Sequence, residues 1–161
     1  MKATEAHTEA SARALGTLEQ CNACIDAEIE PVSGSAWLYA CRTERHLIRF
    51  GISDGQLRLQ TWRNHRLLQD LKQDLPADAG RRLRLRLEVN GKAAMGFLDG
   101  RPAFPTRLNV PDDFGGGWVG LAAHAPERGR AVLDVFRLRV NGCPLRLAMV
   151  PSNPTPEATD A

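Results

Sequence analysis

Apolar and polar residues alternate with a period of two along much of the chain. Across residues 83–89, a leucine or valine occupies every second position, and an arginine or glutamate occupies each position between them. Residues 57–62 alternate in the same way, and residues 131–140 form a longer, more continuously apolar run. Because successive side chains of a strand point to opposite faces, this pattern predicts strands with one face in a core and one in water.

Turn residues separate these runs. Asp54-Gly55, Asn90-Gly91, Asp99-Gly100 and Asn141-Gly142 each lie between alternating segments, and such pairs accept the positive φ angles of a type I′ hairpin turn. About eleven short strands are predicted, at residues 22–30, 36–42, 46–53, 56–62, 66–71, 82–90, 93–98, 101–104, 117–123, 131–140 and 144–149. Many short strands with regular turns are typical of an all-β sandwich or barrel.

One shared core is predicted for the apolar positions of the later strands. Its members are Leu83, Leu85, Leu87, Val89, Val119, Leu121, Val135 and Leu138. Their alternation with charged residues determines which face they occupy, since a slip of one residue would turn the whole set toward water.

The length of 161 residues fits one domain. Residues 1–18 are predicted to be a flexible or helical N-terminal extension, residues 19–150 the β-sandwich, and the proline-rich residues 151–161 a disordered tail. No apolar run approaches the roughly 18 residues that span a bilayer, so we expect no membrane insertion. We expect a cytoplasmic protein if the chain is complete, and an extracytoplasmic one if a signal peptide or upstream region was removed.

Three motifs in the second half of the chain resemble a known superfamily. They are FLDG at residues 97–100, GWVGL at 117–121 and DVFRL at 134–138. Together with the first two strands they resemble the concanavalin A-like lectin/glucanase superfamily, in its laminin-G-like and family-16-hydrolase-like branches. The resemblance covers about residues 20–148 and implies a jelly roll of two curved antiparallel sheets, with ligands bound on the concave face.

Asp26, Glu28 and Glu30 are the candidate catalytic residues. Their spacing places all three carboxylates on one face of a strand, and family-16 glucanases carry a similar acidic triple. A retaining glycosidase needs two carboxyl groups about 5–5.5 Å apart. Pro31 follows this triple directly, and the triple lies on the first predicted strand. A solvated strand face is therefore the preferred interpretation, and a glycoside hydrolase is the alternative.

A second constellation is suited to binding sugars. Trp37 and Tyr39 share a strand face, and Trp62 continues the polar row of Arg58 and Gln60. Aromatic rings stack on the apolar faces of sugars, while polar side chains hydrogen-bond the hydroxyl groups. The predicted ligand-binding residues are Trp37, Tyr39, Arg49, Trp62, Asn64 and His65.

The charges indicate which partners to expect. Residues 42–86 carry eleven basic and five acidic groups, whereas the whole chain has a net charge of only +2. Nucleic-acid-binding domains are usually much more basic, so no nucleic-acid partner is predicted. The preferred function is a non-catalytic module that binds a polysaccharide or glycan, with an anionic glycan suggested by the basic middle segment. The third alternative is a structural or protein-interaction module, attached to a larger protein or assembly through its polar tails.

The cysteines and Asp134 have structural interpretations. Cys21 and Cys24 have the spacing of a metal or redox motif, but Cys41 and Cys143 do not complete a zinc site. Disulfides or reduced core thiols are expected, with Cys21 or Cys24 near Cys143 because the first and last strands of a jelly roll run side by side. In some relatives the position of Asp134 helps to bind calcium, which needs six to eight oxygen ligands. No other cofactor is predicted.

Overall fold

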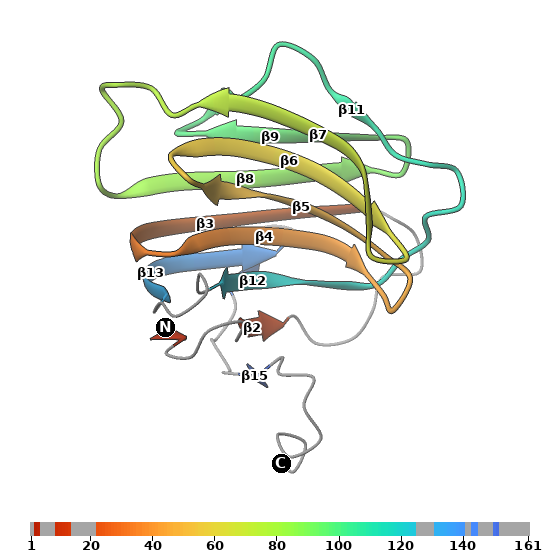
Figure 1. Ribbon diagram of the computed structural model, residues 1–161, viewed down its shortest axis with the longest axis horizontal. Helices are drawn as coiled ribbons and strands as arrows, with labels where there is room; N and C mark the ends of the chain where they lie inside the picture. The colour runs from red at the N-terminus through yellow and green to blue at the C-terminus, as the bar shows by residue number, and fades with distance from the viewer. Residues whose placement is uncertain are drawn as a thin grey trace.

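The computed structural model describes residues 2–3, 9–13, 22–124, 131–140, 143–144 and 150–151. These residues form two antiparallel sheets that lie one over the other (Figure 1). The predicted all-β sandwich is confirmed. None of the described segments is a helix that is long and apolar enough to cross a membrane.

The strands are divided between an eight-stranded sheet A and a seven-stranded sheet B, as far as the chain is described. Sheet A contains, in spatial order, β1 (Lys2–Ala3), β13 (Ala131–Val140), β3 (Asn22–Ser33), β8 (Leu83–Asn90), β9 (Ala93–Leu98) and β10 (Arg101–Pro102), with β11 (Leu108–Asn109) paired to β9 and β14 (Cys143–Pro144) paired to β13. Sheet B contains, in spatial order, β15 (Val150–Pro151), β2 (Glu9–Arg13), β12 (Trp118–His124), β4 (Ser35–Arg42), β5 (His46–Ser53), β6 (Gln56–Arg63) and β7 (Arg66–Asp74).

Each of the eleven predicted strands has a counterpart, although β14 covers only the start of the last one. The remaining strands are short. β11 forms within a predicted loop, and β15 pairs with β2 at the start of the predicted tail. Within residues 1–18, where a flexible or helical extension was expected, β1 pairs with β13 and β2 pairs with β12. These pairings satisfy backbone groups that would otherwise be exposed at the edges of both sheets.

The hairpin turns follow the predicted chemistry in part. Asp54-Gly55 and Asp99-Gly100 have positive φ at both residues, as type I′ turns require. In Asn90-Gly91 only the glycine has positive φ, and the Asn90 side chain accepts hydrogen bonds from the backbone N–H groups of Lys92 and Ala93. Asn141-Gly142 lies outside the described residues. The β6–β7 hairpin has positive φ at Asn64 and His65, which the sequence did not indicate.

The predicted core set is confirmed with one qualification. Seven of its eight residues are buried, while Val135 is partly buried against the same core. Gly96 makes room for a large neighbour, because a Cβ at this position would lie 2.6 Å from the ring of Phe50. Phe50 packs edge-on against Phe104, with 6.0 Å between the ring centroids. The core therefore joins β5 of sheet B to β9 of sheet A.

A β-bulge near the end of β4 changes the direction of the side chains that follow. Cys41 has a φ of 54°, and the β12–β4 register shifts between the pairs Trp118–Arg42 and Gly120–Tyr39. Both Ala40 and Cys41 consequently belong to the core. Arg42 then lies on the same side as Tyr39, with its guanidinium carbon 5.0 Å from the ring centroid. Bulges of this kind re-aim a side chain at the rim of a sheet.

The cysteine predictions are answered only for the described side chains. Cys41 is disulfide-bonded, and Cys24 carries a thiol outside any disulfide. Cys24, which was expected to lie near Cys143, therefore forms no disulfide with it. The side chains of Cys21 and Cys143 lie outside the described residues. The prediction assumed that the first and last strands of the sandwich lie side by side, and β3 and β13 do pair along their lengths.

Candidate functional site

All three tryptophans and the single tyrosine of the chain lie on one surface, the face of sheet B that points away from the core. On β4, Trp37 and Tyr39 alternate with core residues, so their side chains lie on this outer face. Trp62 continues the outward row of β6, and Trp118 precedes the core residue Val119 on β12. Three strands, β4, β6 and β12, thus contribute aromatic rings to one surface.

The strand register brings the predicted residues into direct proximity. Tyr39 on β4 pairs with Arg49 on β5, and Arg49 pairs with Gln60 on β6. Gln60 pairs in turn with Asp70 on β7. Side chains in such a row are about 4.5–5.5 Å apart at Cβ. A continuous polar line therefore crosses the outer face beside the aromatic rings.

Arg49 lies at the centre of this arrangement. Its guanidinium carbon is 3.9 Å from the ring centroid of Trp37 and 5.2 Å from that of Trp62. Its Nε donates a hydrogen bond of 2.7 Å to Gln60 Oε1, which also accepts one of 2.9 Å from the indole of Trp62. Cation–π contacts and hydrogen bonds together hold the guanidinium in one orientation.

The charged end of the same network is Asp70. It accepts hydrogen bonds from Gln60 and from Arg58, the latter with a shortest distance of 2.5 Å. Burial by itself would raise the pKa of Asp70, but the hydrogen bonds from Arg58 and Gln60 outweigh it and lower the pKa below its usual value. The pKa of Arg58 is raised, chiefly by the hydrogen bond to Asp70. Asp70 is therefore a structural anion that anchors Gln60 and, through it, Arg49 and Trp62.

The aromatic rings differ in their access to a ligand. Trp37 and Tyr39 are only 4% and 2% exposed, so in this conformation they support the arginines above them. Trp62 and Trp118 are half-buried and retain accessible ring surface. The sequence predicted a stacking surface from Trp62 and Tyr39; in this conformation Trp62 has an accessible ring, whereas Tyr39 is buried.

A cleft of about 380 Å³ opens beside Trp62, and we call it the Trp62 cleft. It is lined by Arg42, Thr43, Glu44, Arg45, His46, Leu47, Arg49, Trp62 and His65. His65 and Asn64 form the adjoining hairpin tip with φ angles of 63° and 49°. Non-glycine residues in this conformation are strained, and such strain clusters at functional sites. The cleft thus collects Arg49, Trp62 and His65 from the predicted set, with Asn64 beside it.

Several cleft residues were not predicted. Arg42 ends β4, Arg45 lies in the turn that follows, and His46 begins β5; only the bulge at Cys41 directs Arg42 to this side. The basic character of residues 42–86 was the available indication. Trp118 was assigned to a structural motif, because its pairing with Arg42 depends on the contact between β12 and β4.

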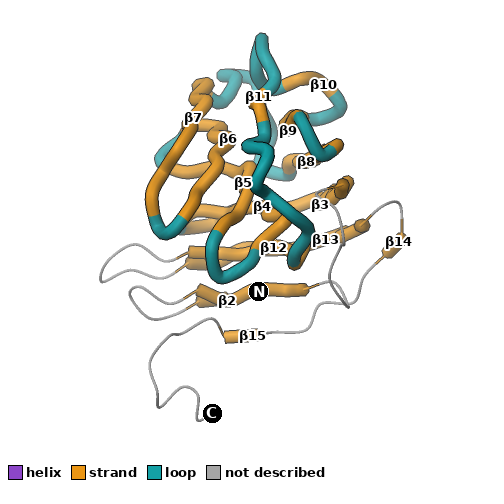
Figure 2. The backbone as a smooth tube through the Cα atoms, turned by 90° about the vertical axis from the view of Figure 1, so that its right-hand side faces the viewer, coloured by secondary structure: helices purple, strands orange, loops and turns teal. Residues whose placement is uncertain are grey.

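His46 is held by a segment from elsewhere in the chain. Figure 2 shows the connection between β10 and β12 running across one end of the sandwich. There the His46 ring stacks on Phe114 at 4.4 Å between centroids, and its Nε2 accepts a hydrogen bond from the Gly115 N–H. Its Nδ1 lies 2.8 Å from the Cys41 carbonyl oxygen. Since that oxygen only accepts, Nδ1 carries the proton, and the ring has a defined orientation beside the cleft.

The acidic triple lies on the other sheet. The outer face of β3, on the side of sheet A that points away from the core, carries Asp26, Glu28 and Glu30. Asp26 pairs with Arg84 at 2.7 Å, a hydrogen bond that raises the pKa of Arg84, and Glu28 pairs with Arg82 at 3.3 Å. The candidate catalytic residues and the candidate sugar-binding residues are thus on opposite surfaces.

Asp134 lies beside this triple, paired across the strands with Glu30 and exposed. No group of three or more histidine, cysteine or acidic side chains that could hold a metal ion occurs in the described part of the chain. The described residues therefore form no such group around Asp134, where calcium binding was considered.

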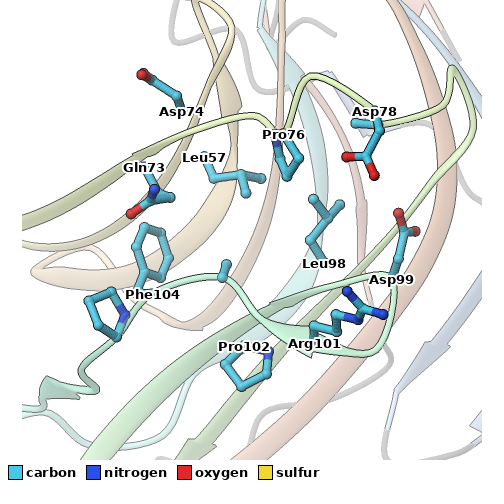
Figure 3. A pocket seen from close by; sticks show the side chains of 13 residues that line it. Leu57, Gln73, Asp74, Pro76, Asp78, Leu98, Asp99, Arg101, Pro102 and Phe104 are labelled. Carbon is cyan, nitrogen blue, oxygen red and sulfur yellow. The ribbon is translucent and has the colours of Figure 1, made fainter.

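A larger cavity, of about 990 Å³, opens at the edge of the sandwich between β6–β7 and β9–β10. Figure 3 shows Leu57, Leu98 and Phe104 in its interior, with Asp78, Asp99 and Arg101 around it. Proline and alanine make up much of the remaining wall, and Phe104 is only 8% exposed. This cavity lacks an accessible indole and carries more acidic than basic groups, so the outer face of sheet B is better suited to stacking a sugar.

No protein-family model matches the sequence, and a search of the curated proteins gives no match. Solved structures do resemble it. Carbohydrate-binding module CBM66 from Bacillus subtilis is 13% identical, with a TM-score of 0.63 over 83% of each chain. Sheep galectin-11 is 12% identical, with a TM-score of 0.54 over 80% of this chain and 97% of the galectin. Alginate lyase A1-II′ is 13% identical, with a TM-score of 0.53 over 76% of this chain and 63% of the lyase. The chain therefore has the fold of the concanavalin A-like lectin/glucanase superfamily, as its motifs predicted.

Proposed function

We propose that this chain is a non-catalytic carbohydrate-binding module that holds a polysaccharide or glycan on the outer face of sheet B. The observation that carries the proposal is the collection of all tryptophans and the tyrosine on that face, beside the Trp62 cleft. Similar structures include a carbohydrate-binding module and galectins, which supports a sugar-binding role without specifying the sugar.

Each group has a role in this proposal. Trp62 stacks on the apolar face of a sugar ring, while Arg49 donates hydrogen bonds to its oxygen atoms. Asn64 and His65 close one side of the ligand at the hairpin tip. Trp37, Tyr39, Gln60 and Asp70 fix these groups before the ligand arrives, which lowers the entropy cost of binding.

A glycan array with the full chain tests the proposal, followed by titration of the best ligand. Trp62→Ala should weaken binding roughly tenfold or more, because a stacking residue at the centre of a site is typically worth about 2 kcal/mol. The fold should persist, since Trp62 is outside the core cluster. Phe136→Ala is the matched control, because it removes an exposed aromatic ring from β13 of sheet A. Unfolding of Trp62→Ala, or equal losses in both variants, would contradict the proposed site.

A further inference from the structure

His46 connects the wall of the Trp62 cleft to two other parts of the chain. Its ring lines the cleft and stacks on the buried Phe114, which belongs to the connection between β10 and β12. Its Nδ1 donates a hydrogen bond of 2.8 Å to the carbonyl oxygen of Cys41, the residue at the β-bulge of β4. Its Nε2 accepts a hydrogen bond of 3.2 Å from the Gly115 N–H. One imidazole therefore holds the bulge and the connection against the cleft.

This pair of hydrogen bonds requires a neutral imidazole. A neutral ring has one N–H donor and one nitrogen that accepts, which matches the Cys41 carbonyl and the Gly115 N–H. An imidazolium has two donors and no acceptor, so its Nε2 proton would point at the Gly115 N–H. Histidine is the side chain whose charge ordinarily changes between about pH 5 and about pH 8. Acidification therefore removes the bond to the connection and leaves the bond to the bulge.

Other charged and titratable groups surround the ring. Arg63 pairs with His46 on the neighbouring strand, and its guanidinium forms an ion pair of 2.5 Å with Asp113 of the connection. The set also includes Asp112 on the connection and Arg42, Glu44, Arg45 and His65, which line the cleft with His46. His65 is the same type of side chain as His46, so the experiment has to separate the two histidines.

We propose that His46 is a pH-sensitive positioning residue, which supports the Trp62 cleft when its imidazole is neutral and releases the connection when it is protonated. In the neutral form, the bonds to Cys41 and Gly115 fix the ring in the cleft wall. In the protonated form, the Gly115 bond is broken and the wall loses one of its supports. The site therefore binds its glycan more weakly as pH falls, and this last step rests on the proposed function.

Nuclear magnetic resonance of the full chain tests the switch without any glycan. The signals followed are the His46 imidazole, the Gly115 amide and the Trp62 indole N–H, from about pH 8 to about pH 5. All three should change with one midpoint. Hydrogen exchange at Gly115, corrected for its intrinsic pH dependence, should accelerate in the acidic form. A Gly115 signal that does not follow the His46 midpoint overturns the switch, and a Trp62 signal that does not follow it overturns the coupling to the cleft.

Two substitutions of His46 separate its hydrogen bonds from its stacking. In glutamine, the amide oxygen is as many bonds from the backbone as ring Nε2, so His46→Gln keeps an acceptor for Gly115 at every pH. In asparagine, the amide nitrogen corresponds to Nδ1, so His46→Asn keeps the donor to Cys41 and removes the acceptor. Both variants lose the ring that stacks on Phe114. Fast exchange at Gly115 should therefore occur at every pH in His46→Asn and at no pH in His46→Gln.

Titration with the tightest-binding oligosaccharide of the glycan array then connects the switch to binding. Sugar hydroxyl, carboxylate and sulfate groups keep their charge between about pH 5 and about pH 8, so a pH effect comes from the protein. The affinity of the unsubstituted chain should fall roughly fivefold from about pH 7.5 to about pH 5, which corresponds to one net hydrogen bond. His46→Gln should abolish this fall, and a decline that remains in this variant belongs to His65.

His124→Gln is the matched control, because His124 lies at the opposite end of β12 from the β4 bulge. It should keep the pH profile of the unsubstituted chain. A full fivefold fall in His46→Gln, or its loss in His124→Gln, overturns the role of His46. Failure of all glycans to bind at every pH overturns the proposed function, while the resonance measurements still decide the switch.

Discussion

At the residue scale, the same types of side chain behave differently on the two outer faces. Arg49 on sheet B is bonded through Nε to a neutral amide between two indoles, whereas Arg84 on sheet A is paired directly with the carboxylate of Asp26. Arg49 is thus contacted by aromatic rings and an amide, and Arg84 by a carboxylate.

The acidic triple provides a test at this scale. The pair of substitutions Asp26→Asn and Glu30→Gln should leave glycan binding nearly unchanged, because these side chains lie on the sheet opposite the Trp62 cleft. The measurement is a titration with the ligand found on the array, together with an assay for reducing ends. A glycosidase activity that disappears in the double variant would favour the hydrolase alternative instead.

Asp70 predicts a pH dependence of stability. Its pKa in the folded protein is below the usual value of 3.8, so the stability it contributes is present above that value and is lost as pH falls through the folded pKa. Asp70→Asn should therefore flatten the decline in the free energy of unfolding as pH falls below about 4 and through the lowered pKa. Urea denaturation at several pH values measures this slope. An unchanged slope would show that Asp70 is not the anion that anchors the network.

At the scale of elements, the β6–β7 hairpin combines local strain with a place in the candidate site. His65→Gly should stabilise the protein by about 1 kcal/mol, because glycine adopts positive φ without the steric cost that a side chain incurs. The same change should weaken glycan binding by removing the imidazole. Asp54→Gly in the β5–β6 hairpin is the control, and should leave binding unchanged. Thermal unfolding and titration of both variants measure these effects. Normal affinity of the His65→Gly protein would exclude His65 from the site.

Strands β4 and β5 approach each other closely beneath Trp37. A Cβ at Gly51 would lie 1.9 Å from the Ala36 carbonyl oxygen and 2.8 Å from the Trp37 Cα. Gly51→Ala should therefore cost at least about 1–3 kcal/mol in stability and shift Trp37 under Arg49. Gly80→Ala, whose new Cβ would be 3.7 Å from its neighbour, should be tolerated. Comparison of their denaturation midpoints checks this, and similar midpoints would argue against close packing of the strands.

At the scale of the whole molecule, one core supports both outer faces. Leu85 is fully buried, and its strand pairs with β3 on one side and β9 on the other. Leu85→Ala should cost roughly 2–5 kcal/mol, through lost burial and the cavity that remains. Chemical denaturation gives the value directly. A loss near zero would mean that the strand register is displaced by one residue.

The sequence by itself determined the strands, most of their turns and the identity of the core. Alternation such as that of Leu83, Leu85 and Leu87 is a local property, and so is the preference of Asp54-Gly55 for positive φ, so neither needs tertiary information. Grouping Arg49 with Trp62 was also possible, because a hairpin places neighbouring strands side by side.

The tertiary structure decided on which sheet each of these strands lies and which side chains from other strands lie beside its own. Asp26 and Trp62 each lie on an outward strand face, but only pairing across long stretches of sequence places them on opposite sheets. The bulge at Cys41 turns Arg42 toward the aromatic face, and the pairing of β12 with β4 brings Trp118 beside it. These outcomes depend on strand order and register shifts, which alternation within a single strand does not encode.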